Sequence, residues 1–247
     1  MHFSVEIPPD HPALPGHFPG MPVVPAVVLI EHLAFQLKQL VGVSVSSVKQ
    51  LRLLDPVQPG QSVEVAVSEK GGESWRLTCS VGDKTVAKGV LSSRKGEPEE
   101  VGPYTRTQTP PDYRSARELY RQLPHAGSMQ LVDELALYPS GAQTQITVDE
   151  HHPLVSGRCL PTWGMLEYAA QLMACRKLTL GGEPLRKAVV VMVRSLECVQ
   201  PSVPVGETVD VCVTEDVAQP GAVQCRFSAC MGGKVIAGGA FTVVSEG

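Results

Sequence analysis

The sequence lacks the features that mark several common classes of protein. Lys and Arg number 21 and Asp and Glu number 25, so the net charge is −4 and there is no basic excess for binding nucleic acid. No apolar run reaches the roughly 18 residues that a membrane helix needs. The first ten residues, MHFSVEIPPD, have no basic segment followed by an apolar one, so we expect no signal peptide. We expect a cytoplasmic protein with neither a nucleic-acid nor a membrane partner.

Motifs of several chemistries are missing as well. The chain has no GxSxG, no HExxH, no P-loop and no glycine fingerprint after a strand. Its seven cysteines include no CxxC pair, and Cys79, Cys212, Cys225 and Cys230 lie in strand-like stretches, where a thiol behaves as a small buried hydrophobe. We therefore predict structural thiols in a reducing compartment, with no disulfides and no metal site.

The sequence contains instead one passage that is repeated. HPALPGHFPGMPVVPAVVLIE starts at His11, and HPLVSGRCLPTWGMLE starts at His152. Both begin with His-Pro, three residues and a Gly, and both end with a Pro, five residues and a Glu in an apolar stretch. His17 follows the Gly of the first copy, whereas Arg158 and a shorter loop follow the Gly of the second. The chain thus repeats a passage and keeps the histidine once.

The segments after each passage repeat in the same order. An apolar helix is predicted from about Pro25 to Leu40 and again from about Pro161 to Leu180. Each helix is followed by two alternating strand-like runs and then by a hairpin, which in the first half turns at Gly82-Asp83. A helical lead-in, SARELYRQL, and a further strand pair open the second half.

These patterns predict an α+β architecture in two copies. The Pro-, Gly-, Glu- and Thr-rich residues 94–112 form the expected linker, so the units are residues 1–93 and 113–247. Each long helix is apolar almost all round and needs a curved antiparallel sheet to cover it. We expect the two units to pack face to face as a pseudo-dimer.

Two glutamates and one histidine are the candidate chemical groups. Glu31 and Glu167 each follow the helix-opening Pro by six residues in apolar surroundings, which favour a protonated carboxyl group of raised pKa. Such an acid can protonate a leaving group near neutral pH. His17 lies in GHFPGMP, a loop stiffened by Gly and Pro, and imidazole suits proton removal at cellular pH. The structural alternatives are a glutamate that faces water and a hydrogen-bonded loop histidine.

The string His17-Phe18-Pro19-Gly20-x-Pro22-Val23-x-Pro25, with Glu31 fourteen residues after the histidine, resembles the signature of the β-hydroxyacyl-ACP dehydratases. LPHAGSMQLVDEL and PTWGMLEYAAQ in the second half resemble further segments of that family. The resemblance implies the hot-dog fold, a long helix wrapped by an antiparallel sheet, and therefore a double hot-dog in this chain. The layout also resembles the paired catalytic and non-catalytic dehydratase subunits of aryl polyene biosynthesis.

In that family the active site lies between two hot-dog units, with the histidine from one and the acid from the other. The resemblance therefore pairs His17 with Glu167 as catalytic residues and leaves Glu31 opposite Arg158. It also implies the substrate-binding residues Phe18, Gly20, Pro25, Ala26, Val27 and Gln171. Two positions depart from the family pattern, since Ala26 replaces the usual Gly and Phe35 the usual Gln, which Gln171 keeps in the second half.

The resemblance implies a lyase that converts 3-hydroxyacyl-ACP into trans-2-enoyl-ACP in fatty-acid-like or polyene biosynthesis. The substrate would arrive on the phosphopantetheine arm of an acyl carrier protein, and no cofactor or metal would be needed. Helix-start amides near Ala26 and Val27 would stabilise the enolate-like charge. A homodimer is expected, because exposed sheet edges often pair. Two alternatives stay open: a non-catalytic hot-dog scaffold for acyl carrier protein, and a hot-dog acyl thioesterase.

Overall fold

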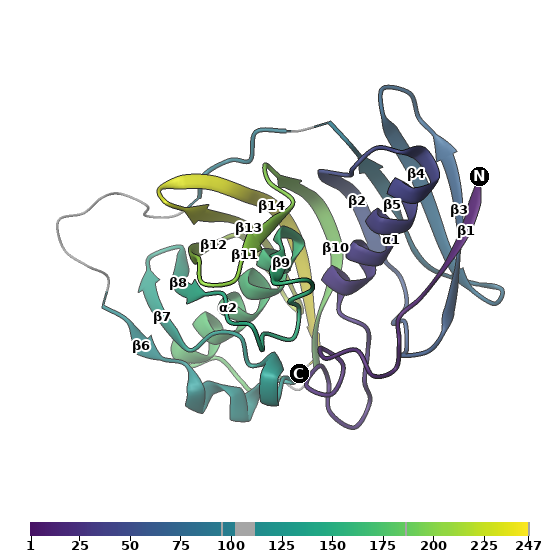
Figure 1. Cartoon of the computed structure of the whole chain (residues 1–247). Helices are drawn as coiled ribbons and strands as arrows, with labels where there is room; N and C mark the ends of the chain where they lie inside the picture. The colour runs from purple at the N-terminus through teal and green to yellow at the C-terminus, as the bar shows by residue number, and fades with distance from the viewer. Residues whose placement is uncertain (95, 102–111, 186, 247) are drawn as a thin grey trace.

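The computed structural model describes residues 1–94, 96–101, 112–185 and 187–246 (Figure 1). Of the expected linker 94–112, residues 95 and 102–111 lie outside the described residues. The first half contains β1 (His2–Glu6), α1 (Ala26–Val41), β2 (Ser47–Leu53), β3 (Ser62–Glu69), β4 (Ser74–Val81) and β5 (Lys84–Ser92).

The second half has the same core and several additions. Its strands are β6 (Arg114–Ser115), β7 (Glu134–Tyr138), β8 (Gly141–Thr147), β9 (Cys159–Pro161), β10 (Lys187–Cys198), β11 (Ser202–Pro204), β12 (Thr208–Gln219), β13 (Ala222–Met231) and β14 (Lys234–Glu246). Its helices are α2 (Met165–Thr179) and the short 3₁₀ helices η1 (Arg117–Gln122), η2 (Gly127–Met129) and η3 (Thr162–Gly164). The predicted lead-in helix is thus only the 3₁₀ turn η1, whereas both long helices are confirmed.

Local chemistry explains where the repeated elements stop. Helix α1 ends at Gly42, which adopts φ 76° and whose N–H donates to the carbonyl of Lys38 at 2.8 Å. Glycine enters this left-handed region without the Cβ clash that other residues suffer. The β4–β5 hairpin pairs Val81 with Lys84, so Gly82 and Asp83 form its two-residue turn, as predicted.

One continuous sheet joins the two halves. Its order is β1-β3-β4-β5-β2-β10-β14-β13-β12-β8-β7-β6, so the two halves mirror each other about the β2–β10 pair. Figure 1 shows α1 and α2 each cradled by its own half of this sheet, with β2 and β10 side by side between them. The double hot-dog is confirmed. The expected face-to-face packing is wrong, because the free edges of β2 and β10 satisfy each other's backbone groups.

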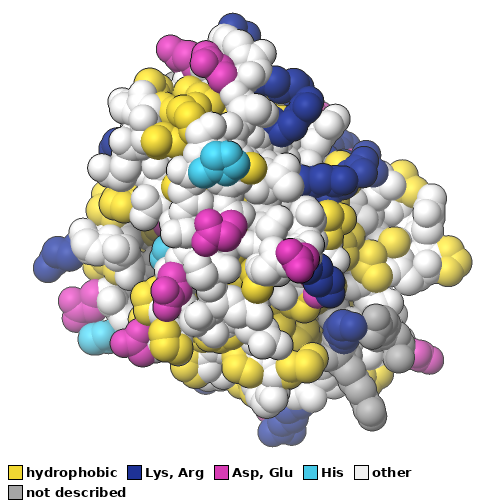
Figure 2. Space-filling model, turned by 90° about the vertical axis from the view of Figure 1, so that its right-hand side faces the viewer, with side chains coloured by type: hydrophobic (Ala, Val, Ile, Leu, Met, Phe, Trp, Pro, Cys, Tyr) yellow, Lys and Arg dark blue, Asp and Glu magenta, His cyan; other side chains and the backbone are white. Residues whose placement is uncertain are grey.

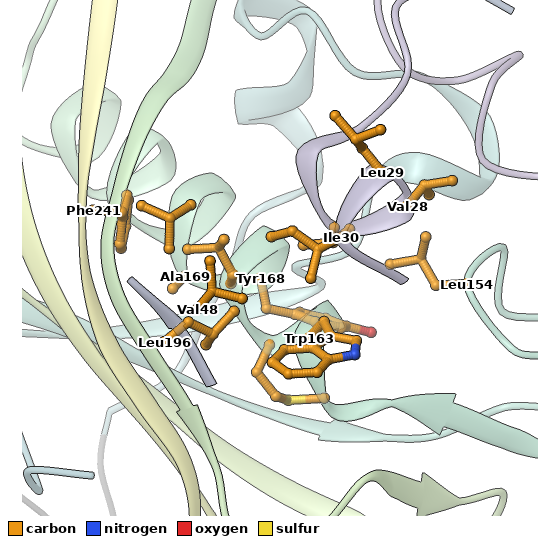
Figure 3. Close-up of a cluster of buried hydrophobic side chains, with 14 of the residues drawn as sticks. Val28, Leu29, Ile30, Val48, Leu154, Trp163, Tyr168, Ala169, Leu196 and Phe241 are labelled. Carbon is orange, nitrogen blue, oxygen red and sulfur yellow. The ribbon is translucent and has the colours of Figure 1, made fainter. Parts of the chain in front are cut away.

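The core lies between the helices and these central strands. Val48 of β2 pairs with Leu196 of β10, and both are fully buried. Figure 3 shows their side chains beside Ile30 of α1 and Tyr168 and Ala169 of α2. Burying each large aliphatic side chain contributes roughly 1.5–3 kcal/mol. The packing therefore fixes the two helices, and the residues at their N-terminal ends, relative to one another.

The remaining sequence expectations about composition can be compared with the same structure. All seven cysteines are free thiols and six of them are buried, which confirms the burial predicted for Cys79, Cys212, Cys225 and Cys230. Within the described residues, no helix is long and apolar enough to span a membrane. On the face shown in Figure 2, acidic, basic and hydrophobic side chains are interspersed.

Candidate active site

The two His-Pro passages fold into the same turn. In the first, His11 Nδ1 accepts from the N–H of Ala13 at 3.2 Å, and its carbonyl accepts from the N–H of Leu14. In the second, His152 Nδ1 accepts from the N–H of Leu154 at 3.1 Å, and its carbonyl accepts from Val155. These two histidines are structural, and they set the direction of the loop that leads to each helix.

The first loop is pressed onto the second half of the chain. The N–H of Phe18 donates to the carbonyl of Pro124 at 3.1 Å, and the N–H of Ala126 donates to the carbonyl of Gly16 at 2.9 Å. A Cβ at Gly16 would overlap the carbonyl oxygen of Ala126 and come within 2.9 Å of Met129 Cβ. Glycine is therefore required before the histidine, because the two halves meet backbone to backbone there.

His17 is held in one orientation by its surroundings. Its Nδ1 lies 2.7 Å from the carbonyl oxygen of Val23, which can only accept, so Nδ1 carries the proton and Nε2 keeps its lone pair. Phe18, at φ 61°, places its ring edge-on against the imidazole at a centroid distance of 4.7 Å. A non-glycine residue in the left-handed region is strained and persists where its surroundings impose it. His17 is thus a fixed proton acceptor that is 8% exposed.

Glu167 reaches the same place from α2. Its Oε1 accepts from Gln171 Nε2 at 2.9 Å, and Gln171 Oε1 in turn accepts from the hydroxyl of Tyr120 and the N–H of Leu131. Glu167 is 6% exposed and Gln171 is 1% exposed. The four-residue spacing places both side chains on one helix face, and the hydrogen bonds hold the carboxyl group toward the other half.

His125 completes the cluster, and the sequence analysis missed it. Its Nε2 lies 3.4 Å from Glu167 Oε1, and its ring centroid lies 5.4 Å from that of His17. One donor atom from each of these three residues lies within 4.8 Å of the others. The signal was available in LPHAGSMQLVDEL, a segment whose histidine received no role.

The electrostatics of the cluster differ from the expectation for Glu167. Burial raises the pKa of Glu167, but the hydrogen bond from His125 and the positive charge available on His17 and His125 outweigh it and lower the pKa to about 2. The predicted raised pKa is therefore wrong for Glu167, although burial does raise the pKa of Glu31. Burial lowers the pKa of His17 below its ordinary value, against the opposing charge of Glu167. His17 is consequently a neutral base near pH 7.

An apolar cavity of about 780 Å³ opens from this cluster between the two halves. Among its lining residues are Leu29 and Leu53 from the first half and Ala170, Met173 and Val190 from the second. A second hollow, of about 660 Å³, meets it at Phe18, Met21, Leu123, Pro124 and His125, and is bounded by the charged side chains of η1. The cluster therefore lies where a long apolar ligand can reach it.

The predicted substrate-binding residues fall into two groups. Phe18, Ala26 and Gln171 line the larger cavity. Gly20, Pro25 and Val27 are not among the described residues that line it, so their role in binding substrate stays a prediction. Gly20 supplies a turn at φ 87°, Pro25 precedes α1 as its N-cap, and the side chain of Val27 is buried at 3% exposure. The backbone N–H groups at the start of α1 nonetheless have no partner within the helix.

Two imidazoles and a carboxylate are also a donor set that zinc accepts. Within the described residues, His17, His125 and Glu167 are the one group of such side chains close enough for this. The contacts they make are a backbone hydrogen bond at His17, an amide hydrogen bond at Glu167 and the 3.4 Å approach of His125 Nε2 to Glu167 Oε1. These are contacts of groups that hold and pass protons, so we interpret the cluster as an acid–base site.

Comparison with protein families follows the division seen in the sheet. Residues 1–90 match the ApeI-like family, described as ApeI dehydratase, and residues 117–246 match the ApeP-like family, described as ApeP dehydratase. The chain belongs to the ApeI/ApeP dehydratase family.

Individual proteins are also similar to this chain. The 3-hydroxyacyl-[acyl-carrier-protein] dehydratase FabZ of Chlamydia trachomatis serovar L2 is 29% identical over 99 residues, which span 34% of this chain and 64% of FabZ. The dehydratase domain of CurJ, in an inactive mutant, superposes with a TM-score of 0.76 at 14% identity over 99% of this chain and 91% of that one. A trans-AT PKS dehydratase domain from Brevibacillus brevis superposes with a TM-score of 0.75 at 14% identity, over 100% and 94%. The two superpositions establish the double hot-dog fold.

The second, pseudo-equivalent position of the chain differs sharply from the site at His17 and Glu167. There Glu31 is half-buried, and burial raises its pKa against an opposing interaction with the side chain of Trp163, which is 5% exposed and is drawn in Figure 3. Arg158, which stands where the histidine would be, is exposed at φ 66°, and its carbonyl accepts from the N–H of Val205. Phe35, the counterpart of Gln171, is 56% exposed. The second carboxyl group therefore lies beside an indole, and among the described residues no hydrogen-bond network holds it as Gln171 and Tyr120 hold Glu167.

Proposed function

We propose that the protein dehydrates 3-hydroxyacyl thioesters, with His17 as the base and Glu167 as the acid. The observation that carries this proposal is the meeting of an oriented, neutral imidazole from one half and a buried carboxyl group from the other at an apolar cavity. An elimination of water needs both groups, since a proton must leave C2 while the C3 oxygen gains one.

The reaction then follows from the geometry. His17 Nε2 removes a proton from C2, the released electron pair forms the C2=C3 bond, and the C3–O bond breaks. Glu167 delivers a proton to the departing hydroxyl, and water leaves. The N–H groups of Ala26 and Val27 at the start of α1 stabilise the negative charge that develops on the thioester oxygen, and such donors contribute about 3–4 kcal/mol in comparable sites. No cofactor takes part in these steps.

The shape and lining of the cavity support the proposed substrate class. An apolar hollow of about 780 Å³ suits an acyl chain, and the thioester would lie beside His17 and the start of α1. The acyl group would be delivered on the phosphopantetheine arm of an acyl carrier protein, since the FabZ relative is named for a substrate on that carrier. Trans-2-enoyl-ACP would be the product, in fatty-acid-like or polyene biosynthesis. Homodimer formation through a free edge of the sheet stays a prediction.

A direct assay tests this function. The purified chain is incubated with a (3R)-3-hydroxyacyl thioester of a carrier protein, and the enoyl product is followed by mass and by ultraviolet absorbance. Conversion with loss of water supports the proposal. Release of free thiol would indicate a thioesterase, and binding of the carrier without turnover would indicate a scaffold, so either result would overturn it.

A further inference from the structure

One buried group of the active site has no task in the proposed reaction. The Nε2 atom of His125 lies 3.4 Å from Glu167 Oε1, while its Nδ1 is buried and makes no hydrogen bond. Among the described residues, only Ser47 and Thr162 carry a buried side-chain oxygen or nitrogen in the same state. A buried polar atom without a partner costs stability. This cost in stability favours a functional role for the His125 ring.

The backbone holds His125 where it can act on Glu167. His125 and His17 form an isolated antiparallel bridge, and the Phe18 ring packs against His125 at a centroid distance of 5.8 Å. The side chains of His125 and Glu167 are 8% and 7% exposed, so bulk water has little access to the contact. The contact is therefore shielded from exchange with bulk water.

The proposed reaction requires a proton that is held near Glu167. Glu167 must give a proton to the leaving hydroxyl, yet its surroundings favour the carboxylate in the absence of substrate. We propose that His125 is a positioning residue that holds on Nε2 the proton that Glu167 passes to the C3 oxygen. This inference rests on the proposed dehydration.

The proton count closes over one turnover. The proton moves from His125 Nε2 to the Glu167 carboxyl group, which gives a proton to the leaving oxygen as the C3–O bond breaks. His17 has meanwhile gained the C2 proton. The donor atoms of the three residues lie within 4.8 Å of one another, a span that one water molecule can bridge, so the water released by the reaction can carry that proton from His17 back to the His125–Glu167 pair. The substrate loses water and the protein is unchanged.

The charged groups that face His125 support this assignment. Glu167 faces it from α2 and His17 from the loop before α1. Across the second hollow lie Arg117, Glu118 and Arg121 of η1, which are exposed to solvent and therefore screened. Arg121 and Glu118 also pair with each other at 2.7 Å. Glu167 is thus the buried acidic group that faces His125.

The test separates proton storage from simple hydrogen bonding. In His125→Gln the amide can still donate to Glu167, but it cannot take up or release a proton. With a 3-hydroxyacyl thioester we expect kcat to fall by about 10²–10⁴, the usual contribution of a proton-transfer group, with little change in KM. With a 3-chloroacyl thioester, chloride leaves without protonation, so the variant should match the wild type after the uncatalysed rate is subtracted. His152→Gln, which alters a histidine bonded to Tyr168 outside the cavity, is the matched control.

Each outcome decides the matter. Wild-type activity of His125→Gln on the hydroxy substrate overturns the inference, because an N–H donor would then suffice. Equal losses on both substrates also overturn it, because they indicate a structural role. An inactive wild type would refute the proposed dehydration itself. Melting temperatures verify folding, and His125→Asn, assayed on both substrates, replaces a Gln variant that fails to fold.

Discussion

The two pseudo-equivalent glutamates provide the strongest contrast in the molecule. Glu167→Gln removes the only atom that can lose a proton but keeps the shape of the side chain, and its amide can still bond to Gln171. A general acid contributes about 10²–10⁴ in rate, which corresponds to roughly 3–5 kcal/mol of activation free energy. We expect kcat for dehydration to fall by that factor with the fold intact. The assay is enoyl-thioester formation with carrier-bound substrate.

Glu31→Gln is the matched control, because the same substitution is made six residues after the equivalent proline. Its amide oxygen can still accept from Trp163, so the change in activation free energy should stay within about 0.5 kcal/mol, roughly a twofold change in rate. Melting temperatures of both variants exclude unfolding as the cause. The reasoning fails if Glu31→Gln is the inactive variant, or if both variants lose activity equally.

Two further predictions concern the loop that carries His17. Gly16→Ala should destabilise the fold by about 1–3 kcal/mol through overpacking and also lower kcat/KM, because its Cβ would overlap the Ala126 carbonyl. Calorimetry and the dehydration assay check this, and an unchanged melting temperature with wild-type activity would contradict it. Burial lowers the pKa of His17, so this base stays neutral as the pH falls toward 6.5. The acid limb of the kcat/KM profile should therefore have its midpoint below pH 6.5. A midpoint above that value in a pH-rate profile would show that His17 is not the titrating base.

The repeat made most of the fold predictable. Once the two passages from His11 and His152 are matched, the helix, the strand runs and the hairpin follow in both halves, and their mirrored order in the sheet agrees. The pairing of β2 with β10 was missed, because alternation identifies a strand but does not reveal which edge it will join.

The candidate site was predictable only in those parts that the resemblance to the β-hydroxyacyl-ACP dehydratases implies. Pairing His17 with Glu167 required a relationship between halves, and the structure places both residues at one cavity. The pKa of Glu167 was predicted in the wrong direction because the reasoning used only its apolar neighbours in sequence. His125 comes from a segment that is distant in sequence, and its contact with Glu167 helps to lower the pKa that burial alone would raise. The interaction of Trp163 with Glu31 could not be predicted from the sequence for the same reason, because it joins the two halves.

The central claim is that His17 and Glu167, from opposite halves, act together in one chemical step. The most direct measurement is kcat/KM for dehydration by His17→Ala, Glu167→Gln and the double variant. Residues that act as a unit have strongly non-additive effects. We predict that the double variant is about as slow as the slower single variant. A loss equal to the product of the two single losses would show that the residues act independently and would contradict the account.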